Sequence, residues 1–489
     1  MIFLESLVLL LAAIPRSIEL LSGNYLFQYD QGQFYLAVKE IVVNHKLALI
    51  GVPVGGMGGF FQGPGWYYIL ALPFALMNGD PYGGMILMFL FGIGTVYMGM
   101  QIGKLFGSWR EGLMCGFLLA VSPAIIPQSR FIWPPFPISF LATLFLFFFL
   151  KTLLGNKKYL PWVFFVLGIM SHFETAVAGT LALQFSLFLP LLLWKKIISL
   201  KSLVLSFFAL LLTQVPLLIF DLRHNFLNTR GILGMFTGHG LFNIPPDWIA
   251  NHWSITLDVI RGTFLLGNTI GIALYDFMIL STIYYVIKTK NSFARKYFLF
   301  FLVSSPIVLF LVFLLYRQHV WTWWLIELYV FLCIGGGILL GSLIKHRIAC
   351  IPLYIILAFA SIIFTQNTIS LYAHDYSDYG GTAKIRGKID AIDYIYADAL
   401  GKPFGLFVFT PPVNTYEYDY TFWWYGEKKY KYAPYKEKKG TVYLLIEKDP
   451  DKPWSYNGWL ETVIKDGKVI KETILPSGFI VQTRQYPIN

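Results

Sequence analysis

Apolar stretches long enough to cross a lipid bilayer recur along the first three quarters of this 489-residue chain. A membrane-spanning helix needs about 20 apolar residues, and about eleven stretches reach or approach that length. Only 13% of the residues are charged, against about a quarter in a soluble domain. The sequence therefore excludes a soluble enzyme and predicts an α-helical polytopic membrane protein. The predicted spans are 2–22, 82–103, 111–128, 137–154, 160–176, 177–194, 202–220, 266–287, 297–315, 323–344 and 349–371.

The last quarter of the chain has a different charge balance. Residues 372–489 contain 15 acidic and 16 basic residues, whereas residues 1–371 contain 12 and 22. The excess of positive charge thus belongs to the membrane part, so it does not indicate a nucleic-acid partner. We predict a transmembrane domain at 1–371 and a soluble domain at 372–489.

Helix and strand patterns alternate in the soluble domain, which is typical of an α/β fold. The predicted elements are helices at 385–400 and 422–430, strands at 404–410 and 441–447, and a hairpin at 465–468. A run of aromatic residues has two interpretations, stacking on sugars or resting on the membrane interface, and the second is favoured. The run comprises Tyr416, Tyr418, Tyr420, Phe422, Trp423, Trp424 and Tyr425.

Basic residues cluster on alternate loops between the predicted spans. Since Lys and Arg mark cytoplasmic loops, we expect a plasma-membrane protein with a cytoplasmic N-terminus and an extracytoplasmic C-terminal domain. Residues 66–77 offer only about a dozen apolar positions, which suits an interfacial helix. The predicted outer loops are then 23–81, 129–136 and 221–265. The basic clusters are Lys104 and Arg110; Lys157 and Lys158; Lys195, Lys196 and Lys201; Lys288, Lys290, Arg295 and Lys296; and Lys345 and Arg347.

Polar side chains collect on the predicted outer side, and ionisable residues near the membrane are functional candidates. Asp30 lies where a helix would begin, so it is either an N-cap or a functional carboxylate. The glycine-rich segment 51–65, with glycines at 51, 55, 56, 58, 59, 63 and 65, predicts a flexible backbone, either a catalytic loop or a passive linker. The other outer candidates are Arg130, His172, Glu174, Asp221, Arg223, His224, Arg317, His319 and Glu327.

The cysteines give no sign of a disulfide framework or a metal site. Cys115, Cys333 and Cys350 lie in or beside apolar runs, and the C-terminal domain has none. Their spacing matches no metal-ligand pattern. We therefore expect neither a disulfide nor a bound metal.

Three motifs occur in an order that resembles a known class of enzymes. They are Tyr29-Asp30-Gln31 in the first outer loop, Gly63-Pro64-Gly65-Trp66-Tyr67-Tyr68 at the start of the interfacial helix, and Ser122-Pro123 with Arg130. This order resembles the GT-C class of lipid-linked-sugar glycosyltransferases, which includes protein O-mannosyltransferases and the aminoarabinose transferases of lipid A. The resemblance covers roughly residues 1–230, and the later spans and outer domain agree only in layout.

The resemblance implies roles for particular residues. An outer-loop Asp is the base in that class, and Asp30 stands in its position; the acid that commonly follows is replaced here by Gln31. Some members place a Lys before the Pro of the second motif to hold the donor phosphate, but this chain has Gln62-Gly63-Pro64. The phosphate candidates are therefore Arg130, Arg223 and Arg317. The candidates for the sugar or acceptor pocket are His172, Glu174, Tyr29, Gln62, His224 and His319.

The implied reaction moves a sugar from a polyprenyl-phosphate donor to an extracytoplasmic glycan, lipid or protein acceptor. The departing phosphate is a weak base, so one general base that takes the acceptor proton suffices, while cationic side chains balance the charge on the phosphate. Without a diphosphate the usual reason for a metal weakens, so no cofactor is expected. Direct displacement inverts the anomeric centre.

Two other functions fit a polytopic protein. A transporter or flippase would show paired half-repeats and midplane charges, but the sequence has no internal repeat, and Asp276 is the one acid well inside a predicted span. A polymerase or ligase of the O-antigen type would carry its largest outer loop between late spans, whereas here the large outer piece is terminal. Sugar transfer is the favoured function.

Overall fold

The computed structural model describes residues 2–54, 60–236, 246–265, 267–288, 292–344, 347–411 and 414–487. The chain divides into two compact units. The helical unit comprises Met1–Ser17, Leu47–Ile69 and Ile86–Tyr372, and the mixed unit comprises Ile18–Lys46, Leu70–Met85 and Ala373–Asn489. Several residues of the sequence predictions lie outside the described residues, namely Gly55, Gly56, Gly58, Gly59, Lys290 and Lys345.

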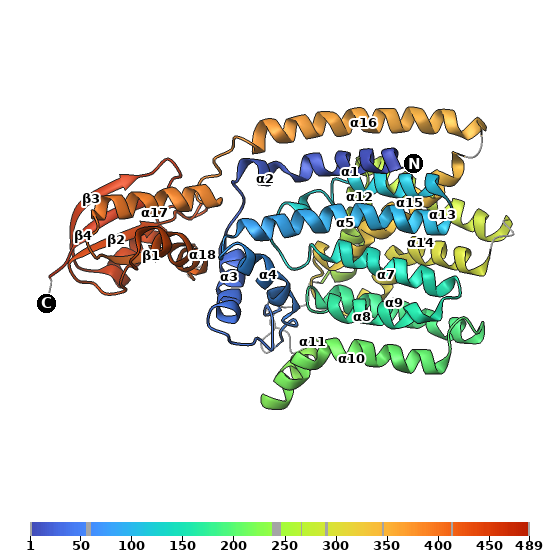
Figure 1. The fold of residues 1–489 in the computed structure, drawn as a ribbon, viewed down its shortest axis with the longest axis horizontal. Helices are drawn as coiled ribbons and strands as arrows, with labels where there is room; N and C mark the ends of the chain where they lie inside the picture. Colours follow the sequence, from blue (N-terminus) through green and yellow to red (C-terminus); the bar gives the residue numbers. More distant parts are fainter. Residues whose placement is uncertain are drawn as a thin grey trace. The chain divides into compact units, whose positions relative to one another are not determined.

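The helical unit is a bundle in which α8 packs against α7, α9 and α10 (Figure 1). Every predicted span contains a helix, but the first one breaks at Ser17 into α1 and α2. Three helices, α4, α5 and α16, have residues in both units. The helices of this unit are α1 (Ile2–Arg16), α4 (Gly65–Leu76), α5 (Tyr82–Phe106), α6 (Trp109–Val121), α7 (Ile138–Leu153), α8 (Leu160–Met170), α9 (Thr175–Trp194), α10 (Leu200–Arg223), α11 (Leu227–Phe236), α12 (Trp248–Thr263), α13 (Asn268–Lys288), α14 (Phe293–Phe313), α15 (Ile326–Leu343) and α16 (Arg347–Asp375), with short 3₁₀ turns η1 (Pro127–Ser129), η2 (Lys157–Tyr159) and η3 (Thr322–Leu325).

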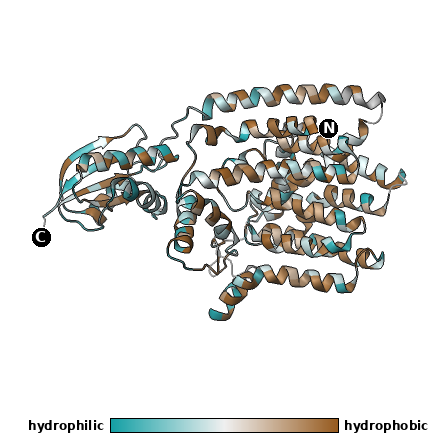
Figure 2. Ribbon diagram, in the orientation of Figure 1, coloured by the Kyte–Doolittle hydropathy of each residue, from teal (hydrophilic) through white to brown (hydrophobic). Residues whose placement is uncertain are grey.

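Seven helical segments in the described part of the chain are long and apolar enough to cross a membrane. They confirm a polytopic membrane protein, but they do not confirm the count of eleven spans. Figure 2 shows apolar residues on most faces of these helices. Large apolar side chains on α10 and α16, such as Leu212 and Ile355, are exposed, which suits lipid contact because hydrocarbon tails solvate apolar surface. The seven segments are Tyr82–Phe106, Thr175–Trp194, Leu200–Arg223, Ile270–Lys288, Phe293–Phe313, Thr322–Leu343 and Tyr354–Asp375.

Small residues allow α6 and α15 to pack closely at the centre of the helical unit. A Cβ added at Gly337 would lie 2.5 Å from the Cα of Cys115, and one at Gly341 would lie 2.5 Å from the Cα of Glu111. Packing of this kind supplies helix association in membranes, where no hydrophobic gain is available between helices. Bulkier residues at these glycines would separate the two helices.

Arg16 fixes the end of α1 against the end of α6. Its guanidinium is 1% exposed and donates hydrogen bonds to the carbonyls of Ala12 at 2.8 Å, Ala120 at 2.9 Å and Leu119 at 3.0 Å. The last carbonyls of a helix lack intrahelical partners and favour a cation. Arg16 therefore caps α6 from a neighbouring helix.

The mixed unit contains a four-stranded sheet of order β1-β2-β4-β3. Strands β1 and β2 are parallel, and β4 runs antiparallel to both β2 and β3. One face packs on α17 through a core that includes Ile395, Phe404 and Tyr443. The elements are α2 (Ile18–Ser22), α3 (Tyr29–Val42), α17 (Ile385–Ala399), β1 (Gly405–Phe409), α18 (Tyr416–Thr421), a π-helical turn η4 (Phe422–Glu427), α19 (Lys428–Tyr430), β2 (Thr441–Ile446), α20 (Ser455–Trp459), η5 (Leu460–Ile464), β3 (Lys468–Ile474) and β4 (Ile480–Gln485).

The hairpin predicted at 465–468 was wrong in position. Lys465 and Gly467 do have positive φ, 58° and 100°, but the residues before them are helical in η5, so the segment that precedes β3 is not a strand. The hairpin turn instead joins β3 to β4, where the N–H of Leu475 donates to the carbonyl of Phe479 at 2.8 Å.

The aromatic run was also interpreted wrongly at three positions. Tyr418, Tyr420 and Phe422 are almost fully buried. Tyr418 and Phe422 belong to the core beneath the sheet, and the ring of Tyr420 packs against Tyr35 at 5.1 Å. These side chains stabilise the mixed unit and are not available to a sugar or to the membrane interface.

Candidate functional site

The glycine-rich segment of the helical unit is a short antiparallel ladder. The N–H of Gly51 donates to the carbonyl of Gln62 at 2.8 Å, and the N–H of Gln62 donates to the carbonyl of Val52 at 2.9 Å. An isolated bridge pairs Pro53 with Phe61. A Cβ on Gly51 would overlap the carbonyl oxygen of Gly63, so the close approach of the two arms requires glycine there.

Two side chains that are distant in the sequence hold this ladder, Asn228 in α11 and His172 in the turn between α8 and α9. The Oδ1 of Asn228 accepts the N–H of Phe61 at 2.7 Å, and the Nδ1 of His172 accepts the N–H of Gly65 at 3.1 Å. The Nε2 of His172 lies 2.8 Å from the carbonyl of Thr213. Because Nδ1 acts as an acceptor, Nε2 must carry the proton that it donates to Thr213. His172 is thereby fixed as one neutral tautomer with both nitrogens engaged.

Asp221 orders the junction that carries Asn228. Its carboxylate accepts the N–H of Asn228 at 2.7 Å, the N–H of Thr229 at 3.1 Å and the Thr229 hydroxyl at 2.6 Å. These are the free donors of the first turn of α11, which a carboxylate stabilises. Asp221 therefore acts on the ladder through Asn228.

A cavity of about 290 Å³ adjoins the ladder in the helical unit. The two residues that flank the ladder's tip, Val54 and Phe60, contribute to its wall, together with Tyr316 and Trp324. Glu174 is the one acid in the lining; it is 4% exposed and caps α9, where its Oε1 accepts the N–H of Ala176 at 3.4 Å. The wall is otherwise mainly apolar, which suits a lipid chain or an apolar face of a ligand.

The other polar candidates of the helical unit lie at the ends of helices or in the segments between them. Arg130 is half-buried directly after η1, whereas Arg223, at the end of α10, and Arg317, after α14, are exposed. His224 stacks on Phe220 with ring centres 4.2 Å apart, and His319 packs on Trp321 at 4.3 Å. No contact between described residues brings the three arginines together.

Two buried groups near the cavity walls lack partners within the described residues. The Oε1 of Gln62 has no hydrogen bond, and neither do the two carboxyl oxygens of Glu327, which is 0% exposed. Buried polar atoms without partners cost free energy and often mark functional sites. Gln62 and Glu327 are therefore two of the described groups of this unit that retain unused hydrogen-bonding capacity.

Asp30 lies in the mixed unit, at the second position of α3. The cap of this helix is formed by Gln28 and Gln31, because the Oε1 of Gln31 accepts the N–H of Gln28 at 2.9 Å. Asp30 is thus not the N-cap. Among the described residues its carboxylate has no hydrogen-bond or ion-pair partner, and burial raises its pKa. A carboxylate with a raised pKa is a stronger base than a solvated one.

The C-terminal part of the mixed unit contributes side chains next to Asp30. The rings of Tyr29 and Tyr416 are 5.1 Å apart at an angle of 49°, and the Nδ2 of Asn414 donates to the Tyr29 hydroxyl at 3.3 Å. The sequence analysis did not select Asn414. The only available signal was its place before an aromatic run.

Arg16 was also missed. A basic residue inside the predicted span 2–22 is a signal in itself, because charges within a span are costly. The described residues contain no group of three or more His, Cys, Asp or Glu side chains placed to hold a metal ion.

Comparison with solved structures reveals the fold. The chain resembles ArnT from Cupriavidus metallidurans bound to undecaprenyl phosphate, with a TM-score of 0.64 over 99% of this chain and 97% of that one, at 11% identity. The chain has the GT-C fold. The apo form of the same protein gives a TM-score of 0.62 over the same shares, at 10% identity.

The GT-C fold also occurs in the archaeal oligosaccharyltransferase AglB from Archaeoglobus fulgidus, solved with an inhibitory peptide and a dolichol-phosphate. Its TM-score is 0.51 at 13% identity, covering 99% of this chain and 75% of that one. The sequence matches no protein-family model and no curated protein. The GT-C fold predicted from the first 230 residues is therefore confirmed over the whole chain.

Proposed function

We propose that this protein is a membrane glycosyltransferase that moves a sugar from a polyprenyl-phosphate donor to an extracytoplasmic acceptor. The observation that carries the proposal is Asp30 at the start of α3, within a GT-C fold. Its carboxylate has no partner among the described residues, and burial raises its pKa. Two proteins of similar fold were solved with such lipids, ArnT with undecaprenyl phosphate and AglB with a dolichol-phosphate. A hexose or pentose fits this chemistry.

Asp30 is the proposed catalytic base. It takes the proton of the acceptor hydroxyl or amine while that atom attacks the anomeric carbon. The bond from the anomeric carbon to the phosphate oxygen breaks, and polyprenyl phosphate leaves with the electron pair. Attack opposite the leaving group inverts the anomeric centre. Phosphate is a good leaving group without added protonation, so this scheme uses no metal or cofactor.

The remaining predicted residues have proposed roles in binding. Arg130, Arg223 and Arg317 are the proposed phosphate ligands, since a guanidinium matches phosphate oxygens in a bidentate manner. Glu174 lines the cavity that we assign to the donor, and His172 holds the backbone of Gly65 beside it. The sugar or acceptor pocket further includes Tyr29, Gln62, His224 and His319.

Asp30→Asn tests the proposal in purified protein with a polyprenyl-phosphate sugar. Asn keeps the shape but cannot accept the proton, so transfer should fall by a factor of about 10² to 10⁴ while donor binding stays near the wild-type level. Arg130→Ala should instead weaken donor binding. Transfer by Asp30→Asn at the wild-type rate would refute the assignment of the base.

The proposed orientation places the N-terminus in the cytoplasm and residues 372–489 outside, in the plasma membrane. The alternating basic loops support it. Topology reporters fused after Lys158 and at the C-terminus should report opposite sides of the membrane. The same side for both fusions would overturn this orientation.

A further inference from the structure

The first outer loop is built into the C-terminal part of the mixed unit. The N–H of Phe27 donates to the carbonyl of Ala383 at 3.0 Å, and the N–H of Ile385 donates to the carbonyl of Tyr25 at 2.9 Å. Leu26 thereby forms an antiparallel bridge with Lys384. The segment just before Asp30 thus adds a short strand to the start of the C-terminal domain.

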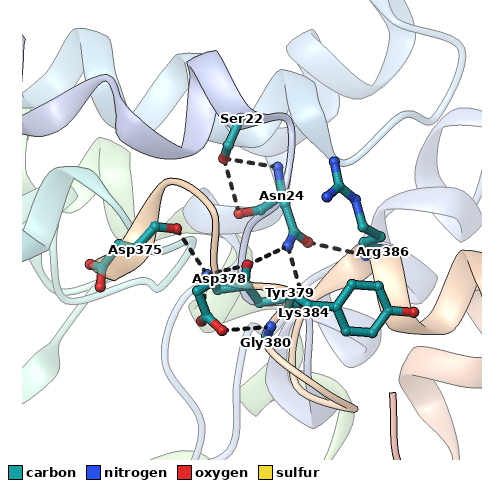
Figure 3. A network of polar contacts seen from close by, with 8 residues as sticks. All are labelled: Ser22, Asn24, Asp375, Asp378, Tyr379, Gly380, Lys384 and Arg386. Atoms are coloured by element: carbon teal, nitrogen blue, oxygen red, sulfur yellow. Dashed lines mark hydrogen bonds and ion pairs between the residues drawn. The ribbon is translucent and has the colours of Figure 1, made fainter. Parts of the chain in front are cut away.

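A polar network reinforces this strand (Figure 3). The Nδ2 of Asn24 donates to the carbonyls of Asp378 at 3.0 Å and Tyr379 at 3.1 Å, and its Oδ1 accepts the N–H of Arg386 at 3.2 Å. Asn24 is 3% exposed. The amide nitrogen and the amide oxygen of Asn24 therefore both form hydrogen bonds to the backbone of the C-terminal domain.

The helix that carries Asp30 is held equally closely. A Cβ at Gly32 would overlap the backbone nitrogen of Glu417 in α18, so α3 and α18 touch backbone to backbone at this point. Gly32 and Asp30 are only two residues apart. The position of Asp30 is therefore set by the C-terminal domain.

The surface beside Asp30 combines three kinds of group. Tyr29 and Tyr416 present half-buried aromatic rings, and Asn414 is exposed. Asn414 uses its amide nitrogen on the Tyr29 hydroxyl, and its carbonyl oxygen has no partner among the described residues. Aromatic faces bind the C–H faces of sugars, and an amide oxygen binds hydroxyls. A hydroxyl of a sugar bound there would lie beside the carboxylate of Asp30, which would take its proton.

We propose that Tyr29, Asn414 and Tyr416 form the acceptor-binding surface beside Asp30, and that its ligand is a hydroxyl-rich sugar ring of a glycan acceptor. This inference rests on the proposed function. It assigns the choice of acceptor to the C-terminal domain.

Saturation-transfer NMR on the full chain in lipid nanodiscs tests the surface. The probes are methyl α-mannoside, methyl β-galactoside and methyl β-N-acetylglucosaminide. At least one should receive saturation from the wild type, and its affinity should fall roughly three- to tenfold in Tyr416→Ala and in Asn414→Ala. Tyr416→Phe keeps the ring and should bind as the wild type does. Trp454→Ala, which removes a 65% exposed aromatic ring elsewhere in the same domain, is the matched control.

Release of polyprenyl phosphate from the donor by the wild type separates the two proposals. If the donor is consumed but no glycoside binds, or the Tyr416 and Asn414 variants bind it normally, the acceptor surface is wrong and the proposed function stands. Glycoside binding that depends on Tyr416, with no use of the donor, would refute the proposed function and keep the sugar-binding surface. Equal loss of binding in Trp454→Ala would also refute the surface, because the effect would then not be local.

Discussion

The side-chain oxygen Oε1 of Gln31 accepts the backbone N–H of Gln28 at 2.9 Å. This bond closes the start of α3 with neutral groups, although the first turn of a helix favours an acid as its cap. Asp30 lies between the two residues and takes no part in the cap. Its carboxylate is consequently not used by the cap, at a place where a helix start also favours negative charge.

The pH dependence of transfer should follow the ionisation of Asp30. Burial raises its pKa, and the base works only when deprotonated. Activity should therefore be lost as pH falls through this raised pKa, at a higher pH than the value of about 3.9 for an ordinary Asp. The acid limb of kcat/KM for the wild type measures it. An acid limb at or below pH 3.9 would contradict the assignment.

Gly32→Ala should impair both folding and transfer. The added methyl group would overlap the backbone of Glu417, so α3 must move away from α18. Overpacking of this kind costs about 1 to 3 kcal/mol, and a displaced base lowers transfer by up to about 10²-fold. Thermal unfolding and transfer assays measure the two effects.

Gly458→Ala is the matched control for that change. Gly458 lies in α20 of the same unit, and a Cβ there would meet nothing within 4 Å. Its substitution should leave transfer unchanged and stability the same or slightly higher. Wild-type behaviour of Gly32→Ala would show that the two helices have room to separate.

Asn24→Ala should loosen the added strand from the C-terminal domain. The change removes three hydrogen bonds to backbone groups, each contributing about 1 kcal/mol. The free energy of unfolding should fall by about 2 to 3 kcal/mol, measured by denaturant titration. Asn457→Ala, at an exposed position in α20, should change it by less than about 0.5 kcal/mol.

Glu417 should make the stability of the mixed unit depend on pH. Burial raises its pKa to about 7 despite the favourable charge of Lys388, and Glu447 and Asp419 act in the same direction as burial. In the unfolded chain its pKa is about 4.3. The folded state therefore holds the proton between these two values, and stability decreases as pH rises through that window.

The total loss of stability across the window should be at most about 4 kcal/mol, because one pKa unit corresponds to about 1.4 kcal/mol. Glu417→Gln has no charge to bury and should flatten the profile above pH 5. The measurement is the midpoint of thermal unfolding between pH 4 and pH 8. An unchanged slope in Glu417→Gln would assign the dependence to another group.

The transmembrane helices were predictable because bilayer thickness sets a length that apolar runs must match. α12 was not, since residues 221–265 were expected to form an outer loop. Its buried positions include His252, Thr256 and Thr263, and the His252 ring is bound to the carbonyl of Gln318 at 2.7 Å. A helix that buries polar groups does not register as an apolar run, although its periodicity is helical.

The candidate base could be found from the sequence because Asp30 is the one acid in its part of the first loop. Its surroundings could not. The bridge between Leu26 and Lys384 and the bond between Asn414 and Tyr29 join residues more than 350 positions apart. Neither leaves a local pattern, because β-bridges of one or two residues and single amide contacts have no periodicity. The packing of Gly32 on Glu417 is hidden for the same reason.

The bridge between Leu26 and Lys384 also has a bearing on biosynthesis. Residues 24–27 leave the ribosome early, but their partners are among the last quarter of the chain to be made. At about 5 to 20 residues per second, the early segment waits on the order of tens of seconds for its strand partner. Until then α3 lacks the neighbours that fix it, so we expect this helix to reach its final position only after Lys384 and Glu417 have been made.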